Sequence, residues 1–233
     1  MKHSKRYREA VKNIDFLKIY SSKEAIEILK KFKHAKFDET LELNMSLNVD
    51  PKKADQQVRS TVSLPHGTGK KAVVLVFARG DKEKEATEAG ADFVGSDELA
   101  EKVLDGWTDF TSVVATPDMM RIVGKLGKVL GPRGLMPSPK AGTVTQDVGT
   151  AVRDIKAGKI EFKVDKGGNI HTFFGKMSFS TDQLLKNYDA LVEAIARSRP
   201  ASVKGNFIKT MTMSSTMGPG LKIELQAFQT VAG

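Results

Sequence analysis

Apolar and polar side chains alternate strictly from residue 40 to residue 50, with leucine, methionine or valine at the odd positions. A period of two residues is typical of a strand with one buried face and one wet face. Because the pattern returns elsewhere, we expect further strands at residues 58–64, 160–165, 170–174, 204–213 and 221–228. Glycines at 167 and 168 predict a hairpin turn before the strand at 170–174. Antiparallel strands with one buried and one solvent-exposed face are therefore expected near both ends of the chain.

Two segments with a helical period begin at capping boxes, at residues 21–24 and 180–183. The second helix is expected to end at Pro200. The first has apolar residues at the spacing i, i+3, i+4 and i+7, namely Ala25, Ile28, Leu29 and Phe32. We expect the first helix to pack on a sheet. A basic arm, residues 2–12, precedes it, and we expect this arm to become helical when docked.

The central part of the chain has a different pattern. A continuous apolar run, residues 72–78, predicts a strand that is covered on both faces. Further strands expected at 92–94 and 112–115 alternate with helices expected at 82–88, 98–105 and 119–130. For the last helix, Thr116 is the expected cap and Pro117 the first-turn residue. Strands that alternate with helices indicate a parallel, doubly wound sheet.

These patterns divide the chain into two domains, for which 233 residues are sufficient. Residues 1–66 and 160–233 share one pattern, and residues 67–159 have the other. We therefore predict an α/β fold: a split two-layer α+β domain formed by both chain ends, with a doubly wound domain inserted into it. The chain crosses between the domains twice, and we hypothesise that this pair of connections is a hinge.

Composition favours an anionic partner. The net charge is +9 and the isoelectric point is about 9.5, which suggests nucleic acid or an anionic membrane surface as the partner. No apolar run approaches the roughly 18 residues of a membrane span, and the first residues lack an apolar signal core, so we expect a soluble, cytosolic protein. With no cysteine and four scattered histidines, the sequence predicts neither a metal site nor a cofactor.

The charge is unevenly distributed. Residues 1–66 hold 14 Lys and Arg against 9 Asp and Glu, and residues 160–233 hold 9 against 6. In the centre, residues 67–120 hold 6 against 11, whereas residues 121–159 hold 8 against 2. The basic half includes the segment 124–143, which is rich in Gly and Pro and is expected to be an exposed loop. The candidate contacts for an anion in and beside this segment are Arg121, Lys125, Lys128, Arg133 and Lys140.

Enzyme motifs are weak or absent. Residues 67–72 match the dinucleotide fingerprint G-x-G-x-x-A, but the match precedes its strand, whereas the cofactor geometry requires it to follow. The chain has no G-x-x-x-x-G-K-[ST] loop and no G-x-S-x-G elbow. No histidine is placed by sequence as a convincing general base. The wet face of the predicted sheet is therefore a better candidate for function.

Short polar side chains on a sheet suit the wide, shallow minor groove of double-stranded RNA, which presents 2′-hydroxyls and base edges. The groups of this kind on the predicted strands are Thr40, Glu42, Asn44, Thr210 and Thr212. Lys36, Lys166 and the basic arm can neutralise phosphates, so binding should depend on salt. Met217 offers an apolar contact for a ribose, and Gly218 lets backbone come close to the RNA.

Six stretches are distinctive when they are taken together. They are FDETLELNMSLNVDP (37–51), RSTVSLPHG (59–67), EAGADFVG (88–95), GKLGKVLGPRGLMPSPKAGTV (124–144), IKAGKIEFKVDKGGNIH (155–171) and TMGPG (216–220). With them, nearly the whole chain resembles the bacterial family of large-subunit ribosomal protein one. The resemblance implies a split α+β domain with an inserted three-layer, Rossmann-like α/β/α domain, and it implies no enzyme activity.

The resemblance also implies a role in translation. The expected partners are large-subunit ribosomal RNA at a mobile side stalk, the deacylated tRNA that leaves the exit site, and the protein's own messenger RNA, whose translation it would repress through a similar site. The expected location is the cytoplasmic ribosome, and the protein is expected to be monomeric when free.

Carried over residue by residue, the family's RNA site lies in the split domain. It falls on Lys36, Phe37, Thr40, Glu42, Asp165, Lys166, Gly168, His171, Thr210, Thr216, Met217 and Gly218. The basic segment of the inserted domain then becomes a secondary RNA contact. One departure is Gly220, which replaces a more usual small polar residue.

Two other classes of protein stay open at this point. A nucleotide-dependent enzyme would explain the doubly wound domain, and would need Lys70 or Arg133 on a phosphate. A generic RNA chaperone would explain the charge without a specific site. Specific binding predicts that a change at Met217 costs more than the loss of one phosphate contact at Lys166.

Overall fold

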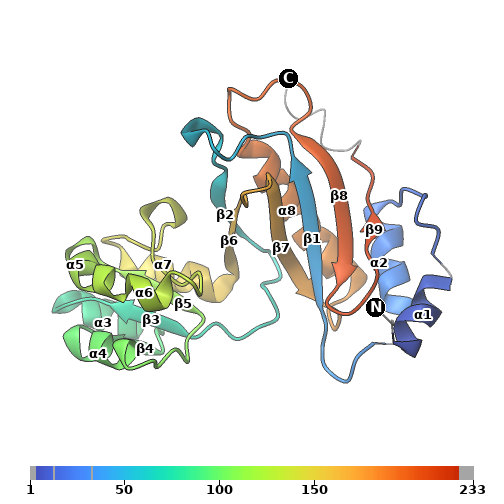
Figure 1. The fold of residues 1–233 in the computed structure, drawn as a ribbon. Coiled ribbons are helices and arrows are strands. Elements are labelled where there is room, and N and C mark those ends of the chain that lie inside the picture. Colours follow the sequence, from blue (N-terminus) through green and yellow to red (C-terminus); the bar gives the residue numbers. More distant parts are fainter. Residues whose placement is uncertain (1–3, 13, 33, 226–233) are drawn as a thin grey trace. The chain divides into compact units, whose positions relative to one another are not determined.

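The computed structural model describes residues 4–12, 14–32 and 34–225, and it forms two compact units (Figure 1). One contains both ends of the chain, Met1–Gly69 and Glu161–Gly233, and we call it the split unit. The other is Lys70–Ile160, and we call it the inserted unit.

The split unit is built on a four-stranded sheet with the order β7-β1-β8-β9. β1 pairs antiparallel with both β7 and β8, so the strand of strict alternation lies inside the sheet. The strands are β1 (Thr40–Leu47), β7 (Asn169–Lys176), β8 (Ile208–Ser215) and β9 (Leu221–Lys222). A separate two-stranded sheet consists of β2 (Arg59–Ser63) and β6 (Lys159–Lys163).

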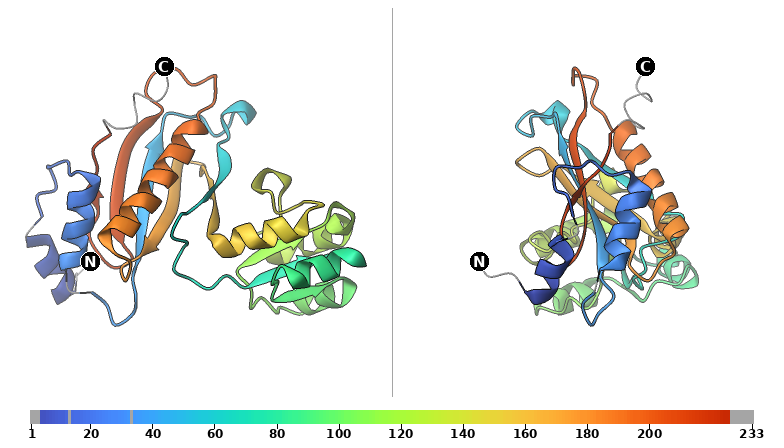
Figure 2. Two further views of the ribbon diagram at one scale, coloured as in Figure 1. Left: turned by 180° about the vertical axis from the view of Figure 1, so that it is seen from behind. Right: turned by 90° about the vertical axis from the view of Figure 1, so that its right-hand side faces the viewer.

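Two helices, α2 (Ser22–Lys31) and α8 (Thr181–Arg197), lie on the same face of the four-stranded sheet (Figure 2). The apolar residues of β1 lie under these helices and are at most 2% exposed: Leu41, Leu43, Met45 and Leu47. The polar residues between them lie on the opposite face. The unit therefore has the two layers that the sequence predicts, with one sheet face left for function.

Both predicted capping boxes are confirmed. Ser21 Oγ accepts the N–H of Glu24, and the Glu24 carboxylate accepts the N–H of Ser21. Ser180 and Gln183 make the same reciprocal pair at the start of α8. These contacts satisfy N–H groups of the first helical turn that have no partner within the helix.

The buried face of α2 differs in part from the prediction. Ala25 and Leu29 are fully buried as expected, but Ile26 is fully buried with them, and Ile28 is only half-buried. The reason is that α2 packs against α8 as well as against β8, so its buried stripe is wider and turned toward its neighbour helix.

The basic arm is already helical, as α1 (Lys5–Lys12), without any docked partner. Its buried residue is Ala10. The Arg6 guanidinium lies 3.7 Å from the carboxylate of Glu39. This ion pair holds the helix against the rest of the split unit. Residues 2 and 3 of the predicted arm lie outside the described residues.

The inserted unit contains a parallel sheet with the order β4-β3-β5. Alternate residues of the central strand belong to different cores: Leu75 and Phe77 pack with α4, α5 and α6, whereas Val74 and Val76 pack with α3 and α7. Helices on both faces give the predicted three-layer α/β/α arrangement. The elements are β3 (Val74–Phe77), α3 (Asp81–Glu88), β4 (Phe93–Gly95), α4 (Asp97–Leu104), β5 (Ser112–Ala115), α5 (Met120–Val123), α6 (Gly127–Leu130) and α7 (Val148–Ala157).

The prediction of a single helix at 119–130 is wrong. The segment is divided into η2 (Pro117–Met119), α5, η3 (Gly124–Leu126) and α6. Gly124 and Gly127 weaken a helix interior, and the Thr116 side chain makes no capping hydrogen bond. The segment still has a buried apolar side, since Val123, Leu126 and Leu130 are 0% exposed.

Helix α7 was not predicted, although it has clear start and stop signals. The Asp147 carboxylate accepts the N–H of Thr150 at 3.0 Å, and Gly158 ends the helix with a φ of 106°. Val148, Val152 and Ile155 form its buried face. Asp at an N-cap and Gly just past the last turn are the usual helix boundaries.

Several predicted limits shift. β1 ends at Leu47 rather than at 50, and β8 runs from Ile208 to Ser215 rather than over 204–213. β9 is Leu221–Lys222, and the expected strand residues 226–228 lie outside the described residues. Two short 3-10 helices complete the elements, η1 (Ala54–Gln56) and η4 (Pro139–Ala141). Within the described ranges, no helix is both long and apolar enough to cross a membrane.

Candidate nucleic-acid interface

The open face of the split unit carries polar side chains in rows that cross three strands. The register places Asn44 of β1 between His171 of β7 and Thr212 of β8. A second row contains Asn169, Ser46 and Thr210, and a third contains Phe173, Glu42 and Ser214. Backbone pairing holds the three strands rigidly, so the hydroxyl, amide and carboxylate groups are presented at fixed spacing.

The hairpin before β7 is held by one carboxylate. Asp165 Oδ1 accepts the N–H of Asn169 at 2.7 Å and that of Gly167 at 2.8 Å. The Asn169 N–H is the main cause that lowers the pKa of Asp165 below its usual value, against a smaller opposing effect of burial. Gly168 has a φ of 81°, a region that glycine adopts without strain. The tight turn leaves Lys166 exposed beside the sheet face.

A second loop, which follows β8, borders the same face at the opposite end of β1 from the hairpin. The N–H of Thr40 donates to Thr216 Oγ1 at 2.9 Å, and the N–H of Thr216 donates to the Thr40 carbonyl at 3.0 Å. Next to this pair, Met217 is 52% exposed and Phe37 is 54% exposed. Large apolar side chains in water are available for contact with a partner. A Cβ on Gly218 would collide with Ser215 Oγ, so the loop needs glycine there.

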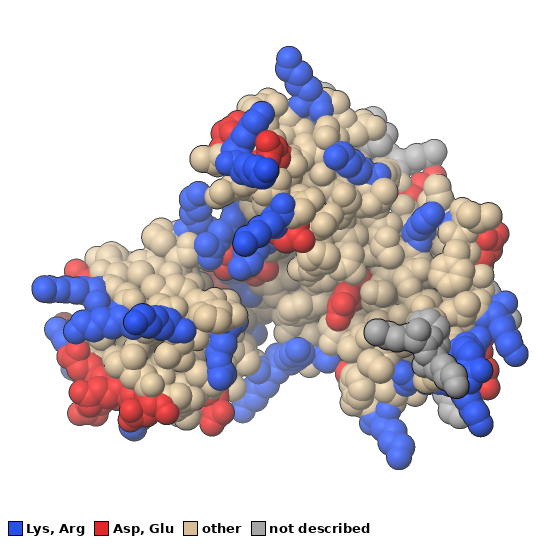
Figure 3. All heavy atoms as spheres, viewed as in Figure 1, with Lys and Arg blue, Asp and Glu red and all other residues tan. Residues whose placement is uncertain are grey.

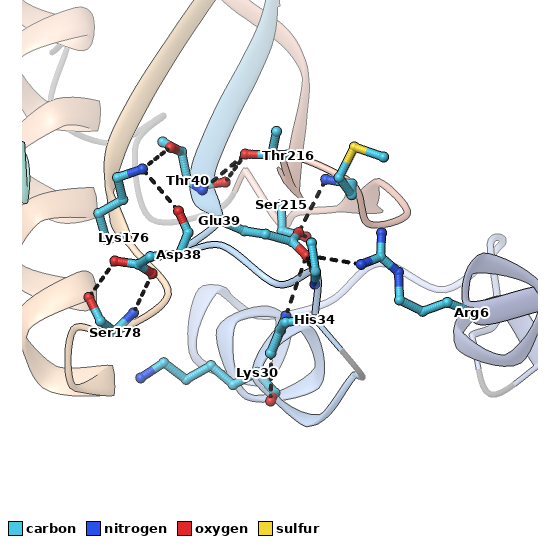
Figure 4. A network of polar contacts seen from close by, with 12 residues as sticks. Arg6, Lys30, His34, Asp38, Glu39, Thr40, Lys176, Ser178, Ser215 and Thr216 are labelled. Carbon is cyan, nitrogen blue, oxygen red and sulfur yellow. Dashed lines mark hydrogen bonds and ion pairs between the residues drawn. The ribbon is translucent and has the colours of Figure 1, made fainter. Parts of the chain in front are cut away.

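The hydroxyl of Thr40 is oriented by a neighbouring cation. Lys176 Nζ donates to Thr40 Oγ1 at 2.8 Å and to the Asp38 carbonyl at 3.1 Å (Figure 4). The Asp38 carboxylate in turn accepts the N–H and the hydroxyl of Ser178. Because Thr40 Oγ1 accepts from Lys176, its own hydrogen is free to be donated outward.

Sequence reasoning missed Glu39, which is only 2% exposed. Its carboxylate accepts hydrogen bonds from Ala35, Ser215 and Met217. Burial raises its pKa, but these hydrogen bonds and the nearby Arg6 charge together lower the pKa below its usual value. The signal was present in the sequence, because Glu39 has the same parity as Leu41 and so continues the inward face of the alternating strand.

All twelve residues carried over by resemblance lie in the split unit, in two groups joined by the sheet. Around the second loop the structure brings together Phe37, Thr40, Thr216, Met217 and Gly218, with Lys36 exposed just before them. At the hairpin end it brings together Asp165, Lys166, Gly168 and His171, with Thr210 across β1. Glu42 lies on the strand between the groups.

The five basic residues predicted as a secondary contact are all exposed and lie in the inserted unit. Arg121 is on α5, Lys125 on η3 and Lys128 on α6, and Arg133 donates to the hydroxyl of Thr108. Lys140 lies in the short helix η4. Figure 3 shows Lys and Arg gathered over α5 and α6, and Asp and Glu gathered over α3 and α4. The unit is therefore polarised, as its sequence halves predict.

Nothing in the described residues supports the enzyme alternative. Gly67 and Gly69 have φ values of 67° and 73°, and a Cβ on Gly69 would lie 2.6 Å from the Lys176 side chain. These glycines therefore shape the connection in the split unit. Within the described ranges, no three His, Asp or Glu residues are grouped to hold a metal ion.

Comparison with known proteins identifies the family of this chain. The model of the ribosomal protein L1p/L10e family matches residues 29–219. A relative, the large ribosomal subunit protein uL1 of Protochlamydia amoebophila (strain UWE25), is 60% identical over 223 residues, which cover 96% of this chain and 94% of that protein. The resemblance inferred from the six stretches is therefore confirmed: the chain belongs to the ribosomal protein L1p/L10e family.

Proposed function

We propose that the open polar face of the split unit binds structured ribosomal RNA of the large subunit. As a member of a ribosomal protein family, the chain is a structural protein of the large ribosomal subunit in the cytoplasmic ribosome, and it is not an enzyme. The observation that carries the RNA site is the polar face itself: three rigidly paired strands with short polar side chains, bounded by two loops that hydrogen bonds hold in place.

The chemistry of the face suits an A-form duplex or a compact RNA fold. Asn44 and Thr212 can exchange hydrogen bonds with 2′-hydroxyls and base edges in the shallow groove. Lys36 and Lys166 are exposed at the two ends of the face, where they can neutralise phosphates. Met217 can pack on a ribose at the same end of the face as Lys36. In this proposal residues 1–66 with 160–233 form the RNA-binding domain, and residues 67–159 form the inserted domain.

Three finer functions rest on the family resemblance. We infer that the RNA lies in the mobile side stalk, that the protein assists release of deacylated tRNA from the exit site, and that it represses its own messenger. A site that reads RNA shape can accept an mRNA segment of similar fold, which supports the last of these. The exposed cations of the inserted unit offer a second surface for RNA or tRNA phosphates.

The test is a salt titration of binding by the full chain. A structured fragment of the large-subunit rRNA stalk would be compared with an unrelated duplex of equal length, and with the leader of the protein's own messenger. We expect a preference for the stalk fragment and the leader that persists as salt is raised, because base and ribose contacts add to phosphate neutralisation. Equal binding to all three RNAs, lost steeply with salt, would instead support the generic chaperone.

A further inference from the structure

Glu39 lies behind the loop that carries Met217, and it meets fixed donors on both oxygens. Oε1 accepts the N–H of Ala35 at 2.7 Å. Oε2 accepts the N–H of Met217 at 3.2 Å and the hydroxyl of Ser215 at 2.7 Å. Figure 4 shows this carboxylate at the centre of the network, between the loop before β1 and the loop after β8.

Only a carboxylate can satisfy these donors. Two of them are backbone N–H groups, which cannot turn around to become acceptors. A glutamine would place its NH₂ group against either Ala35 or Met217, and one partly buried donor would lose its partner. Leaving a buried donor unsatisfied is more costly than the bond itself is favourable. The lowered pKa of Glu39 agrees with a site that is built for the ionised form.

Two basic side chains lie close to the Glu39 carboxylate, one from helix α1 and one from the segment before β1. Arg6 Nη1 lies 3.7 Å from Oε1, and the Arg6 side chain is 24% exposed. His34 Nδ1 lies 3.9 Å from the same oxygen, and its other ring nitrogen contacts the Lys30 carbonyl at 3.1 Å. Helix α1, the 34–39 segment and the 215–217 segment therefore meet at one carboxylate.

We propose that Glu39 is a positioning residue of the RNA site, which holds Met217 and the Phe37 segment in their binding geometry, and that Arg6 makes α1 part of this support. Buried at 2% exposure, Glu39 does not itself touch RNA. Gly218 is also part of this arrangement. A Cβ on Gly218 would collide with the Ser215 hydroxyl, which donates to Glu39. This inference rests on the proposed function.

The first experiment measures stalk-RNA affinity of the full chain with Glu39→Gln. We expect about tenfold weaker binding, the size of effect that one lost hydrogen bond to a charged group produces. The salt dependence should be unchanged, because no phosphate contact is lost. Glu9→Gln is the matched control, since it makes the same charge change at an exposed position of α1; it should bind like the unchanged protein.

A double-mutant cycle separates positioning from general destabilisation. If Glu39 acts through Met217, the cost of Met217→Ala should almost vanish in the Glu39→Gln background. Additive costs, or Glu39→Gln binding as tightly as the unchanged protein, would overturn the proposal. If Glu39→Gln does not fold, Arg6→Gln and Ser215→Ala carry the same cycle with expected losses of about two- to fivefold, as each removes a single partner.

Amide hydrogen exchange in the free protein keeps this inference distinct from the RNA function. Glu39→Gln should speed exchange about tenfold or more at Ala35 or at Met217, whichever N–H faces the NH₂ group, while the central-strand amide of Met45 exchanges as before. A protein that shows no preference for stalk RNA would refute the proposed function. Unchanged exchange at both Ala35 and Met217 would refute the positioning role, whatever RNA is bound.

Discussion

His171 Nδ1 lies 2.7 Å from the side-chain oxygen of Asn44, so β7 and β1 are joined by side chains as well as by their backbone ladder. The other ring nitrogen of His171 lies 3.4 Å from Asp165 Oδ2. One imidazole thus connects the middle of the polar face with the hairpin that ends it. This contact fixes the amide of Asn44, whose NH₂ group remains directed to a partner outside the pair.

We predict that His171→Ala weakens binding to stalk RNA about three- to tenfold, because both Asn44 and the hairpin lose an anchor. The His171 side chain is 61% exposed, so the thermal midpoint should change little. Filter binding and thermal unfolding of the same preparation test both parts. His171→Gln, which keeps a donor, should recover part of the affinity; an equally weak Gln variant would argue against an orienting hydrogen bond.

A second prediction compares an apolar contact with a charge contact. Met217→Asp puts a carboxylate where a ribose is expected, so it should reduce affinity for the stalk fragment more than Lys166→Gln does, each by about 1 to 3 kcal/mol at most. Lys166→Gln should also make binding less dependent on salt. Titrations at several salt concentrations measure both effects. Equal losses for the two variants would favour a generic RNA chaperone.

The general architecture could be predicted because apolar periodicity is a local property of the sequence. The alternation from Leu41 to Leu47 and the continuous run at 72–78 specify a half-wet strand and a covered strand without reference to distant residues. The helix at 119–130 shows the limit of this reasoning. Most of the segment is helical, but it is divided into short helices, and glycine at 124 and 127 weakens a continuous helix.

The support of the candidate site could not be predicted from local pattern. Glu39 receives hydrogen bonds from residues that are 176 and 178 positions away, and periodicity carries no information about such pairs. The parity of Glu39 indicates burial but not a partner. Resemblance supplied the residues of the RNA site, whose role stays a prediction, whereas the groups that hold them became visible only in three dimensions.

A third prediction concerns the cations of the inserted unit. Neutralising three of them together, as Arg121→Gln with Lys125→Gln and Lys128→Gln, should weaken binding to stalk RNA and to an unrelated duplex by similar factors, because phosphate contacts carry no sequence information. The matched control changes Lys82, Lys84 and Lys102 of the acidic half to Gln, and should have a smaller effect. Loss of the preference for stalk RNA in the first variant would locate specificity in the inserted unit.

A fourth prediction concerns stability. Asn187 of α8 is 0% exposed and makes three hydrogen bonds: it accepts the N–H of His66 at 2.9 Å and donates to the carbonyls of Gly67 and Phe174 at 3.0 Å and 2.8 Å. Asn187→Ala removes all three hydrogen bonds and leaves the buried carbonyl of Phe174 without this partner, so we expect a loss of about 2 to 4 kcal/mol in the free energy of unfolding.

Urea unfolding measures that loss, with Asn48→Ala as the control. Asn48 is half-buried and donates one hydrogen bond, to the Lys204 carbonyl, so its loss should be about 1 kcal/mol or less. Similar costs for the two variants would mean that Asn187 does not fasten the 66–67 segment as strongly as its three contacts indicate.

The last prediction uses the titration of Asp165, whose pKa in the folded protein is lowered from its ordinary value of 3.8, chiefly by the N–H of Asn169. A lowered pKa means that the ionised group stabilises the fold above the unfolded-state value, and that this contribution is lost as the pH falls through the folded value. Asp165→Asn keeps an Oδ1 acceptor for both N–H groups of the hairpin but cannot titrate. The difference in unfolding free energy between the two proteins should therefore be constant near neutral pH and should shrink below about pH 4. Burial raises the pKa of Asp189, which changes stability in the opposite direction, but that effect is common to both proteins and cancels in the difference. A difference that stays constant down to pH 3 would show that the Asp165 charge does not stabilise the hairpin.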